Sequence, residues 1–169
     1  LCGWITWHWR RRQHAAEALA AGSDAALLVA FASQTGHAET LAEATAQALR
    51  AAGHAVRLAP LHSLSPQALA SAGTALIVAS TYGEGDPPDQ AAPFWQQCLA
   101  GGAVPLSGLR YGLLALGDRD YGRFCGFGRA LDHWLRANGA TPLFERIDMD
   151  GADAGALQAW QQAVGTLAP

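Results

Sequence analysis

Short apolar segments alternate with longer amphipathic segments from residue 24 to the end of the chain. The apolar segments predict buried strands over residues 26–32, 54–59, 74–79, 111–116 and 141–147. The segments between them are rich in Ala, Leu, Gln and Arg and predict helices over residues 38–52, 90–100, 127–138 and 154–167. Gly53 and Gly139 stand just past two of these helices, where glycine commonly ends a helix. The alternation predicts an α/β fold, a doubly wound five-stranded parallel sheet with helices on both faces.

The first 22 residues have a different pattern, which separates them from a single domain at residues 23–169. Three tryptophans lie between Trp4 and Trp9, and Arg10, Arg11 and Arg12 follow directly. Tryptophans favour the headgroup layer and arginines stay on the cytoplasmic side, so residues 1–22 are typical of the end of a membrane segment plus a linker. Residues 1–9 are too few to span a bilayer, which needs about 20. The alternative is an amphipathic N-terminal helix packed on the domain.

Composition and charge exclude several classes of function. The 169 residues have a formal net charge of −3, which disfavours a nucleic-acid partner. Every basic residue is Arg, so mechanisms that need a Schiff-base lysine or a Walker-type phosphate lysine are excluded. The three cysteines form no CxxC pair and the six histidines show no ligand spacing. We therefore expect no metal site and no disulfide framework.

The loops after the first, third and fourth predicted strands carry the candidate site, because ligands of such sheets bind beyond the carboxyl ends of the strands. The first loop, residues 33–40, combines hydroxyls, a glycine and a helix start. These features form an anion site that keeps a phosphate bound. The same residues also fit an ordinary helix N-cap with Glu39 as a capping-box partner, and the loop alone leaves both possibilities open.

The other two loops each present a tyrosine next to glycine. Tyr82 precedes Gly83 in residues 80–89, and Tyr121 precedes Gly122 in residues 117–126. Glycine permits positive φ close to a ligand, and a tyrosine ring offers a flat face for stacking. A phosphate site flanked by two aromatic rings predicts a receptor for a planar ring with a phosphate tail, and flavin mononucleotide (FMN) fits. A dinucleotide fingerprint is rejected, because its third glycine is missing.

Three motifs resemble the FMN loops of the flavodoxin-like domain in diflavin reductases. They are Ser33-Gln34-Thr35-Gly36-x-Ala38-Glu39, Thr81-Tyr82-Gly83-Glu84-Gly85-Asp86-Pro87 and Leu116-Gly117-Asp118-x-x-Tyr121-x-x-Phe124-Cys125. The family includes the sulfite reductase flavoprotein subunit, cytochrome P450 reductase and the reductase domains of nitric oxide synthases, and the third motif is most similar to the first of these. The resemblance covers residues 27 to about 160. It implies the strand order 2-1-3-4-5, of which flavodoxin itself is the standard example.

The resemblance implies a role in FMN binding for each matching residue. The phosphate would be held by Ser33, Gln34, Thr35, Gly36, His37 and Ala38. The ring would lie between Tyr121 on one face and, on the other, Thr81, Tyr82 and Gly83. The pocket would be shaped by Leu116, Gly117, Asp118, Phe124 and Cys125, and Asp150 matches a family aspartate beside the flavin. Cys125 is expected to be a wall residue rather than a reactive thiol. Arg119 and Arg123 depart from the acidic docking surface usual in the family.

The resemblance also implies a function. The chain would be the FMN-binding electron-transfer module of a membrane-anchored, NADPH-dependent diflavin-type reductase similar to the sulfite reductase flavoprotein. It would relay electrons from a module that binds FAD and NADPH to a haem-containing or other acceptor, with no catalytic residue of its own. Alone it would be only an electron carrier. We expect it at the cytoplasmic face of the inner membrane, although the 169-residue chain by itself would be soluble.

Acidic residues surround the proposed ring and would lower the potential of the flavin by disfavouring its reduced, anionic form. They are Glu84, Asp86, Asp118, Asp120 and Asp150. An ordinary solvated loop face explains each of them equally well.

The sequence leaves two other functions open. One is a free-standing flavodoxin or quinone reductase, and the other is a signalling receiver domain, which would need an aspartate after the first strand and a lysine after the fifth.

Overall fold

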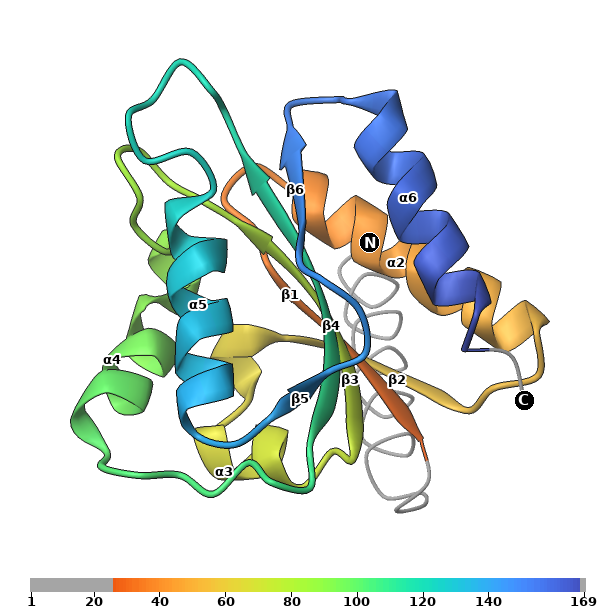
Figure 1. The fold of residues 1–169 in the computed structure, drawn as a ribbon, viewed down its shortest axis with the longest axis horizontal. Coiled ribbons are helices and arrows are strands. Elements are labelled where there is room, and N and C mark those ends of the chain that lie inside the picture. Colours follow the sequence, from red (N-terminus) through yellow and green to blue (C-terminus); the bar gives the residue numbers. More distant parts are fainter. Residues whose placement is uncertain (1–25, 168–169) are drawn as a thin grey trace, which may run out of the picture.

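The computed structural model describes residues 26–167, which form a parallel sheet between two layers of helices (Figure 1). Four strands make the body of the sheet in the order β2-β1-β3-β4: β2 (Val56–Pro60), β1 (Leu27–Ala32), β3 (Thr74–Ser80) and β4 (Arg110–Gly117). Two short strands, β5 (Thr141–Pro142) and β6 (Ile147–Asp150), both pair with the outer side of β4. The predicted order 2-1-3-4-5 is therefore confirmed.

The helices cover both faces of the sheet, as predicted. The helices α2 (His37–Ala51) and α6 (Ala154–Gly165) lie on one face, while α3 (Pro66–Ala70), α4 (Ala92–Ala100) and α5 (Gly126–Ala137) lie on the other (Figure 1). Alternate strand residues serve the two layers: Val29 packs under α2 and α6, whereas Leu28 packs on the opposite side. This two-sided burial is why the strands have continuous apolar sequences.

The N-terminal end of α5 packs unusually close to β4, and two small residues make this possible. A Cβ at Gly128 would lie only 2.4 Å from the Cβ of Ala115, so a larger residue does not fit. The close contact brings the loop before α5 against the carboxyl end of β4. That loop carries the third predicted motif.

The structure corrects the prediction for the last strand. Residues 143–146 leave the sheet and separate β5 from β6, where a single strand over residues 141–147 was predicted. The side chain of Phe144 lies against Gly112 and packs edge-on to Trp160. Arg146 forms ion pairs with Asp132 and Asp148 at 2.9 and 2.7 Å. These contacts stabilise the segment outside the hydrogen-bonded ladder.

The hydrophobic pattern of the sequence did not predict the shortest elements. The helix α3 is five residues long and begins at Pro66 after Ser65, whose hydroxyl accepts a hydrogen bond from the N–H of Ala68. The 3₁₀ turn η1 (Leu61–Ser63) was also not predicted, whereas the 3₁₀ turn η2 (Asp89–Ala91) forms the start of the helix predicted over residues 90–100. Elements of this length contain about one helical turn, so no periodicity can build up. The predicted helix-ending glycines are confirmed, since Gly53 and Gly139 have φ of 95° and 99°.

The predicted membrane end and linker at residues 1–22, like the predicted start of the domain at residue 23, lie outside the described residues. Between residues 26 and 167, none of the helices has the length and apolar character that a membrane crossing requires. The same residues hold no cluster of His, Cys, Asp and Glu side chains of the kind that binds a metal.

Candidate functional site

A hollow of about 470 Å³ opens at the carboxyl ends of β1, β3 and β4. Its volume lies in the range typical of small-molecule pockets. It is lined by Gln34, Thr35, His37, Ser80, Thr81, Tyr82, Gly83, Leu116, Gly117, Asp118, Tyr121, Arg123, Cys125 and Gly151. We call it the switch-point hollow, because the chain turns in opposite directions from β1 and β3, and ligands of doubly wound sheets bind at that position.

Most of the residues predicted for the site lie together in this hollow. They are Gln34, Thr35, His37, Thr81, Tyr82, Gly83, Leu116, Gly117, Asp118, Tyr121 and Cys125. The structure does not place Ser33, Gly36, Ala38, Phe124 and Asp150 in its lining. Three lining residues were missed, namely Ser80, Arg123 and Gly151. Ser80 and Gly151 border predicted residues in sequence, so extending each motif by one position would have included them.

The residues of the first loop face two different hollows. Gly36 has φ of 94° and is the N-cap residue that precedes α2, and its N–H donates a hydrogen bond to the hydroxyl of Ser33 at 2.9 Å. Both residues face a smaller adjoining hollow of about 120 Å³, and Ala38 is fully buried in the core. Thr35 and His37 remain at the switch-point hollow, beside the positive end of α2. The loop therefore combines a local turn with a candidate anion site.

Gln34 ties the first loop to the segment after β3. Its Oε1 accepts a hydrogen bond from the N–H of Asp89 at 2.9 Å, and its Nε2 donates to Oδ2 of the same residue at 3.2 Å. Two bonds to one residue hold the amide in a defined orientation. Gln34 thus contributes to the wall of the hollow and also joins two of its loops.

The second loop is a tight turn that presents Tyr82. The N–H of Tyr82 donates to the carbonyl of Asp86 at 2.8 Å, and the N–H of Asp86 donates back at 2.9 Å. Gly83 and Gly85, between them, have φ of 51° and 128°, which favour glycine. Thr81 donates its own N–H to the carbonyl of Leu116 at 3.1 Å. The turn is consequently attached to the end of β4.

The third loop is shaped by its own aspartates. The Oδ1 of Asp118 accepts a hydrogen bond from the N–H of Asp120 at 2.9 Å, and the carbonyl of Asp118 accepts one from Tyr121 at 3.2 Å. Asp150 accepts a bond from the N–H of Arg119 at 3.2 Å and forms an ion pair with its Nε at 3.4 Å. Asp150 therefore supports the loop from outside the hollow.

Phe124 also supports the third loop rather than lining the hollow. The guanidinium groups of Arg119 and Arg129 lie 5.1 and 5.8 Å from the centre of its ring. Cations at this distance from an aromatic ring are attracted to it, by about 0.5–1 kcal/mol each at exposed sites. These contacts join the loop to the first turn of α5.

Cys125 forms part of the buried wall of the hollow. Its backbone has φ of 54°, its side chain is fully buried, and its Sγ donates a hydrogen bond to the carbonyl of Ala115 at 3.2 Å. Burial, together with the negative charge of Asp148, raises the pKa of this thiol to about 12. The thiol is thus protonated at neutral pH and is no nucleophile. A Cβ at Gly117 would lie 2.6 Å from the N atom of Cys125, so only glycine fits there.

The two tyrosines give the site its chemical character. The exposed fractions of Tyr82 and Tyr121 are 49% and 46%, and both rings line the switch-point hollow. Large aromatic side chains are usually more buried, so two half-exposed rings at one hollow indicate a flat partner. Together with Thr35, His37 and the start of α2, they fit a planar ring that carries a phosphate. The residues present therefore fit FMN.

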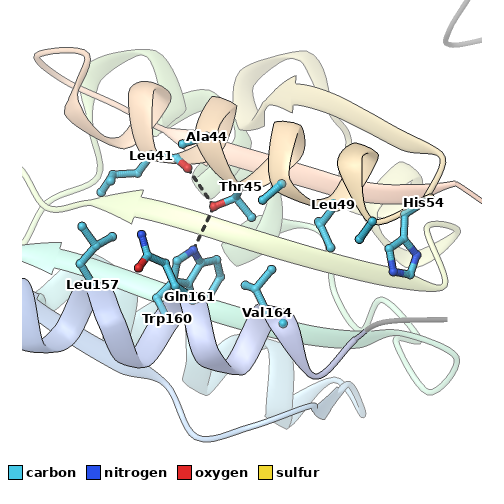
Figure 2. A pocket seen from close by; sticks show the side chains of 12 residues that line it. Leu41, Ala44, Thr45, Leu49, His54, Leu157, Trp160, Gln161 and Val164 are labelled. Carbon is cyan, nitrogen blue, oxygen red and sulfur yellow. Dashed lines mark hydrogen bonds between the residues drawn. The ribbon is translucent and has the colours of Figure 1, made fainter.

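A second hollow, of about 280 Å³, lies between α2 and α6 (Figure 2). Its lining is mainly apolar and includes no Arg, Asp or Glu. The hydroxyl of Thr45 accepts a hydrogen bond from Trp160 Nε1 at 3.0 Å and donates one to the carbonyl of Leu41 at 2.8 Å, so these polar groups are satisfied (Figure 2). This hollow has neither the arginine nor the two half-exposed tyrosines of the switch-point hollow, so we take the switch-point hollow as the candidate functional site.

Fold and site together define a class of protein, a doubly wound α/β domain with a hollow at the switch point of its sheet whose lining fits a phosphorylated planar ring. The family model described as flavodoxin matches residues 29–160. The chain belongs to the flavodoxin family.

Sequence relatives support this assignment. The NADPH sulfite reductase flavoprotein alpha-component of Vibrio vulnificus is 41% identical over 151 residues, which are 89% of this chain and 24% of that protein. The component of the same name from Bacillus subtilis is 37% identical over 135 residues, 80% of this chain and 22% of that protein. The chain thus spans about a quarter of the length of these relatives.

Solved structures show the same fold. A flavodoxin of Streptococcus pneumoniae TIGR4 superposes with a TM-score of 0.74 at 28% identity, covering 85% of this chain and 98% of that one. A point mutant of the flavodoxin from Pseudomonas aeruginosa gives 0.68 at 25% identity, covering 84% and 95%. The resemblance to flavodoxin-like domains drawn from the three motifs is confirmed.

Proposed function

We propose that this chain is the FMN-binding electron-transfer module of an NADPH-dependent diflavin-type reductase similar to the sulfite reductase flavoprotein. The observation that carries the proposal is the pairing of two half-exposed tyrosines with a helix start and hydroxyl loop at one hollow. Bound FMN would supply the chemistry, the uptake and release of one or two electrons.

The side chains of the hollow would bind and orient this cofactor. Thr35, His37 and the N-terminal end of α2 would hold the phosphate, because helix ends and hydroxyls suit an anion. Tyr82 and Tyr121 would cover the two faces of the ring. Leu116 and Cys125, which are buried, would exclude water from one edge of the ring.

Electrons would arrive from a module that binds FAD and NADPH and leave to a haem-containing or other acceptor. Two points support this arrangement: the relatives are named NADPH sulfite reductase flavoproteins, and they are about four times as long as the matched region. The chain would then act within an NADPH-dependent oxidoreductase and would alone be only an electron carrier. This assignment distinguishes it from a free-standing flavodoxin or quinone reductase.

Membrane attachment through residues 1–22 and a position at the cytoplasmic face of the inner membrane remain part of the proposal. Their support is the Trp and Arg pattern of residues 4–12. Flotation with lipid vesicles tests this part: the 169-residue chain should float with vesicles that contain anionic lipid, and a variant that lacks residues 1–22 should not. Equal behaviour of both would contradict the attachment.

The direct test of the cofactor is addition of FMN to the purified protein, followed by gel filtration and absorbance spectroscopy. One FMN per chain should co-elute with the protein and be released on denaturation, because the proposed binding is noncovalent. Thr35→Val with His37→Ala, a double variant at the proposed phosphate site, should bind FMN more weakly. A colourless protein would overturn the proposed function.

A further inference from the structure

Arg123 is a cation at the proposed flavin site that the motifs did not assign. It follows Tyr121 by two positions and lines the switch-point hollow with it. Its neighbours Arg119 and Arg129 form ion pairs with Asp150 and Asp148 at 3.4 Å each. Within residues 26–167, no carboxylate lies within ion-pair distance of Arg123. Its charge is therefore uncompensated by direct contact in the described part of the chain.

The stem of Arg123 lies in a slot between two glycines. A Cβ built on Gly85 would lie 3.1 Å from both Cβ and Cδ of Arg123. A Cβ on Gly126 would lie 3.3 Å from Cβ of Arg123 and 2.7 Å from Cα of Gly85. The second loop, the Arg123 stem and the start of α5 therefore approach one another as closely as glycines allow. This packing places the stem of Arg123 at the edge of the hollow that the residue lines.

We propose that Arg123 raises the reduction potential of the bound flavin by stabilising its reduced form. This inference rests on the proposed function, since it concerns FMN in the switch-point hollow. Bound FMN that takes up two electrons from the reductase module and one proton from solvent would carry one negative charge on its ring. A cation at the edge of the hollow would attract that charge and would have little effect on the neutral oxidised ring.

The proposal gives the loops opposing electrostatic roles. Asp118 lines the hollow together with Arg123, while Glu84, Asp86 and Asp120 belong to the same two loops. These carboxylates would disfavour a negative ring, and Arg123 would counteract them. Because the side chain of Arg123 is exposed, solvent weakens its effect. We expect Arg123 to increase the affinity for reduced FMN on the order of tenfold more than the affinity for oxidised FMN. A tenfold ratio corresponds to about 30 mV for a two-electron couple.

Two variants at Arg123 and one matched control test this inference with the full 169-residue chain. Arg123→Gln removes the charge and keeps much of the stem, whereas Arg123→Lys retains a positive charge. Arg57→Gln is the control: it removes the same charge at an arginine of β2 that does not line the hollow and forms no ion pair among residues 26–167. For each protein, fluorescence titration measures the Kd of oxidised FMN, and equilibration with reference dyes measures the midpoint potential. Circular dichroism checks folding.

The expected result is a lower midpoint potential for Arg123→Gln, a near wild-type potential for Arg123→Lys, and a smaller shift for Arg57→Gln. High salt should reduce the difference between wild type and Arg123→Gln. Equal shifts for Arg123→Gln and Arg57→Gln would overturn the proposal and assign the effect to the overall charge of the protein. A larger Kd for oxidised FMN in Arg123→Gln, with an unchanged midpoint potential, would show that Arg123 is only a binding contact and would also overturn the proposal. If wild type binds no FMN, the proposed function fails first. If Arg123→Gln does not fold, Arg123→Met replaces it, since it also removes the charge and keeps much of the stem, and an unchanged midpoint potential in Arg123→Met would overturn the proposal.

Discussion

The backbone N–H of Phe127 donates a hydrogen bond to the hydroxyl of Thr81 at 3.2 Å. Thr81 lies in the second loop of the switch-point hollow, and Phe127 is the second residue of α5. The bond therefore connects the second loop to the start of α5, 46 residues further along the chain. It uses an N–H at a helix start, which has no partner inside the helix. Thr81 thus caps α5 and fixes the distance between the two tyrosine-bearing loops.

Thr81→Val should destabilise the domain, because it leaves the N–H of Phe127 without its acceptor. Loss of a cap typically costs about 1 kcal/mol. Urea unfolding monitored by circular dichroism measures the change in the free energy of unfolding. Thr74→Val is the control, since its hydroxyl makes only a 3.4 Å contact with Arg110 at an exposed position. Equal stabilities of both variants would contradict the capping role.

Tyr121→Ala should weaken FMN binding more than Tyr82→Ala, because Tyr121 stands in the more specific motif and is expected to cover more of the ring. Each lost stack should cost on the order of 1–3 kcal/mol, by analogy with bases stacked on aromatic side chains. Fluorescence titration measures both affinities. Leu99→Ala, at a 65% exposed position on α4, is the control and should bind FMN normally. Unchanged affinity in both tyrosine variants would exclude stacking.

Gly117→Ala should disrupt the site through a steric clash. Its Cβ would lie 2.6 Å from the N atom of Cys125 and 2.9 Å from its Sγ, both in a buried wall. Overpacking of this kind costs about 1–3 kcal/mol, and the displaced wall should also weaken FMN binding. Gly165→Ala is the matched control, because a Cβ there meets nothing within 4 Å. A Gly117→Ala variant as stable as the control would contradict this prediction and show that the residues around Gly117 can move to accept the methyl group.

The thiols of Cys98 and Cys125 should resist alkylation in the native protein at pH 8. Both are buried, and burial raises the pKa of each to about 12. The unfolded thiols ionise near pH 9, so their contribution to stability is complete below that pH and falls as the pH rises toward 12. Iodoacetamide labelling with peptide mapping, with and without urea, tests this expectation. Rapid native labelling of Cys125 would show that the wall opens.

Electron transfer distinguishes a reductase module from a free-standing reductase. The FMN-loaded chain should not be reduced by NADPH alone, because its sequence has no dinucleotide fingerprint and its switch-point hollow would already hold FMN. It should be reduced when a FAD-containing reductase module is added, more slowly as ionic strength rises, if charges steer the contact. Stopped-flow absorbance measures both rates. Rapid reduction by NADPH alone would favour the free-standing enzyme.

The sequence by itself determined the layers of the molecule and the edge at which the site forms. Apolar segments such as residues 74–79 are continuous because β3 is buried on both faces, and that pattern is legible without a structure. The loops at the carboxyl ends of parallel strands then meet at one edge for geometric reasons. The two tyrosines could be assigned to one site on this ground alone.

Only the tertiary structure decided which way the polar side chains of the loops point. Ser33 turns to the N–H of Gly36, Asp150 turns to Arg119, and Arg123 lies beside Gly85 at the hollow. Tertiary contacts also divided the last strand, where Phe144 leaves the ladder to pack on Trp160. The physical reason is that local periodicity reports burial, whereas the direction of a loop side chain depends on hydrogen bonds and contacts with residues distant in sequence.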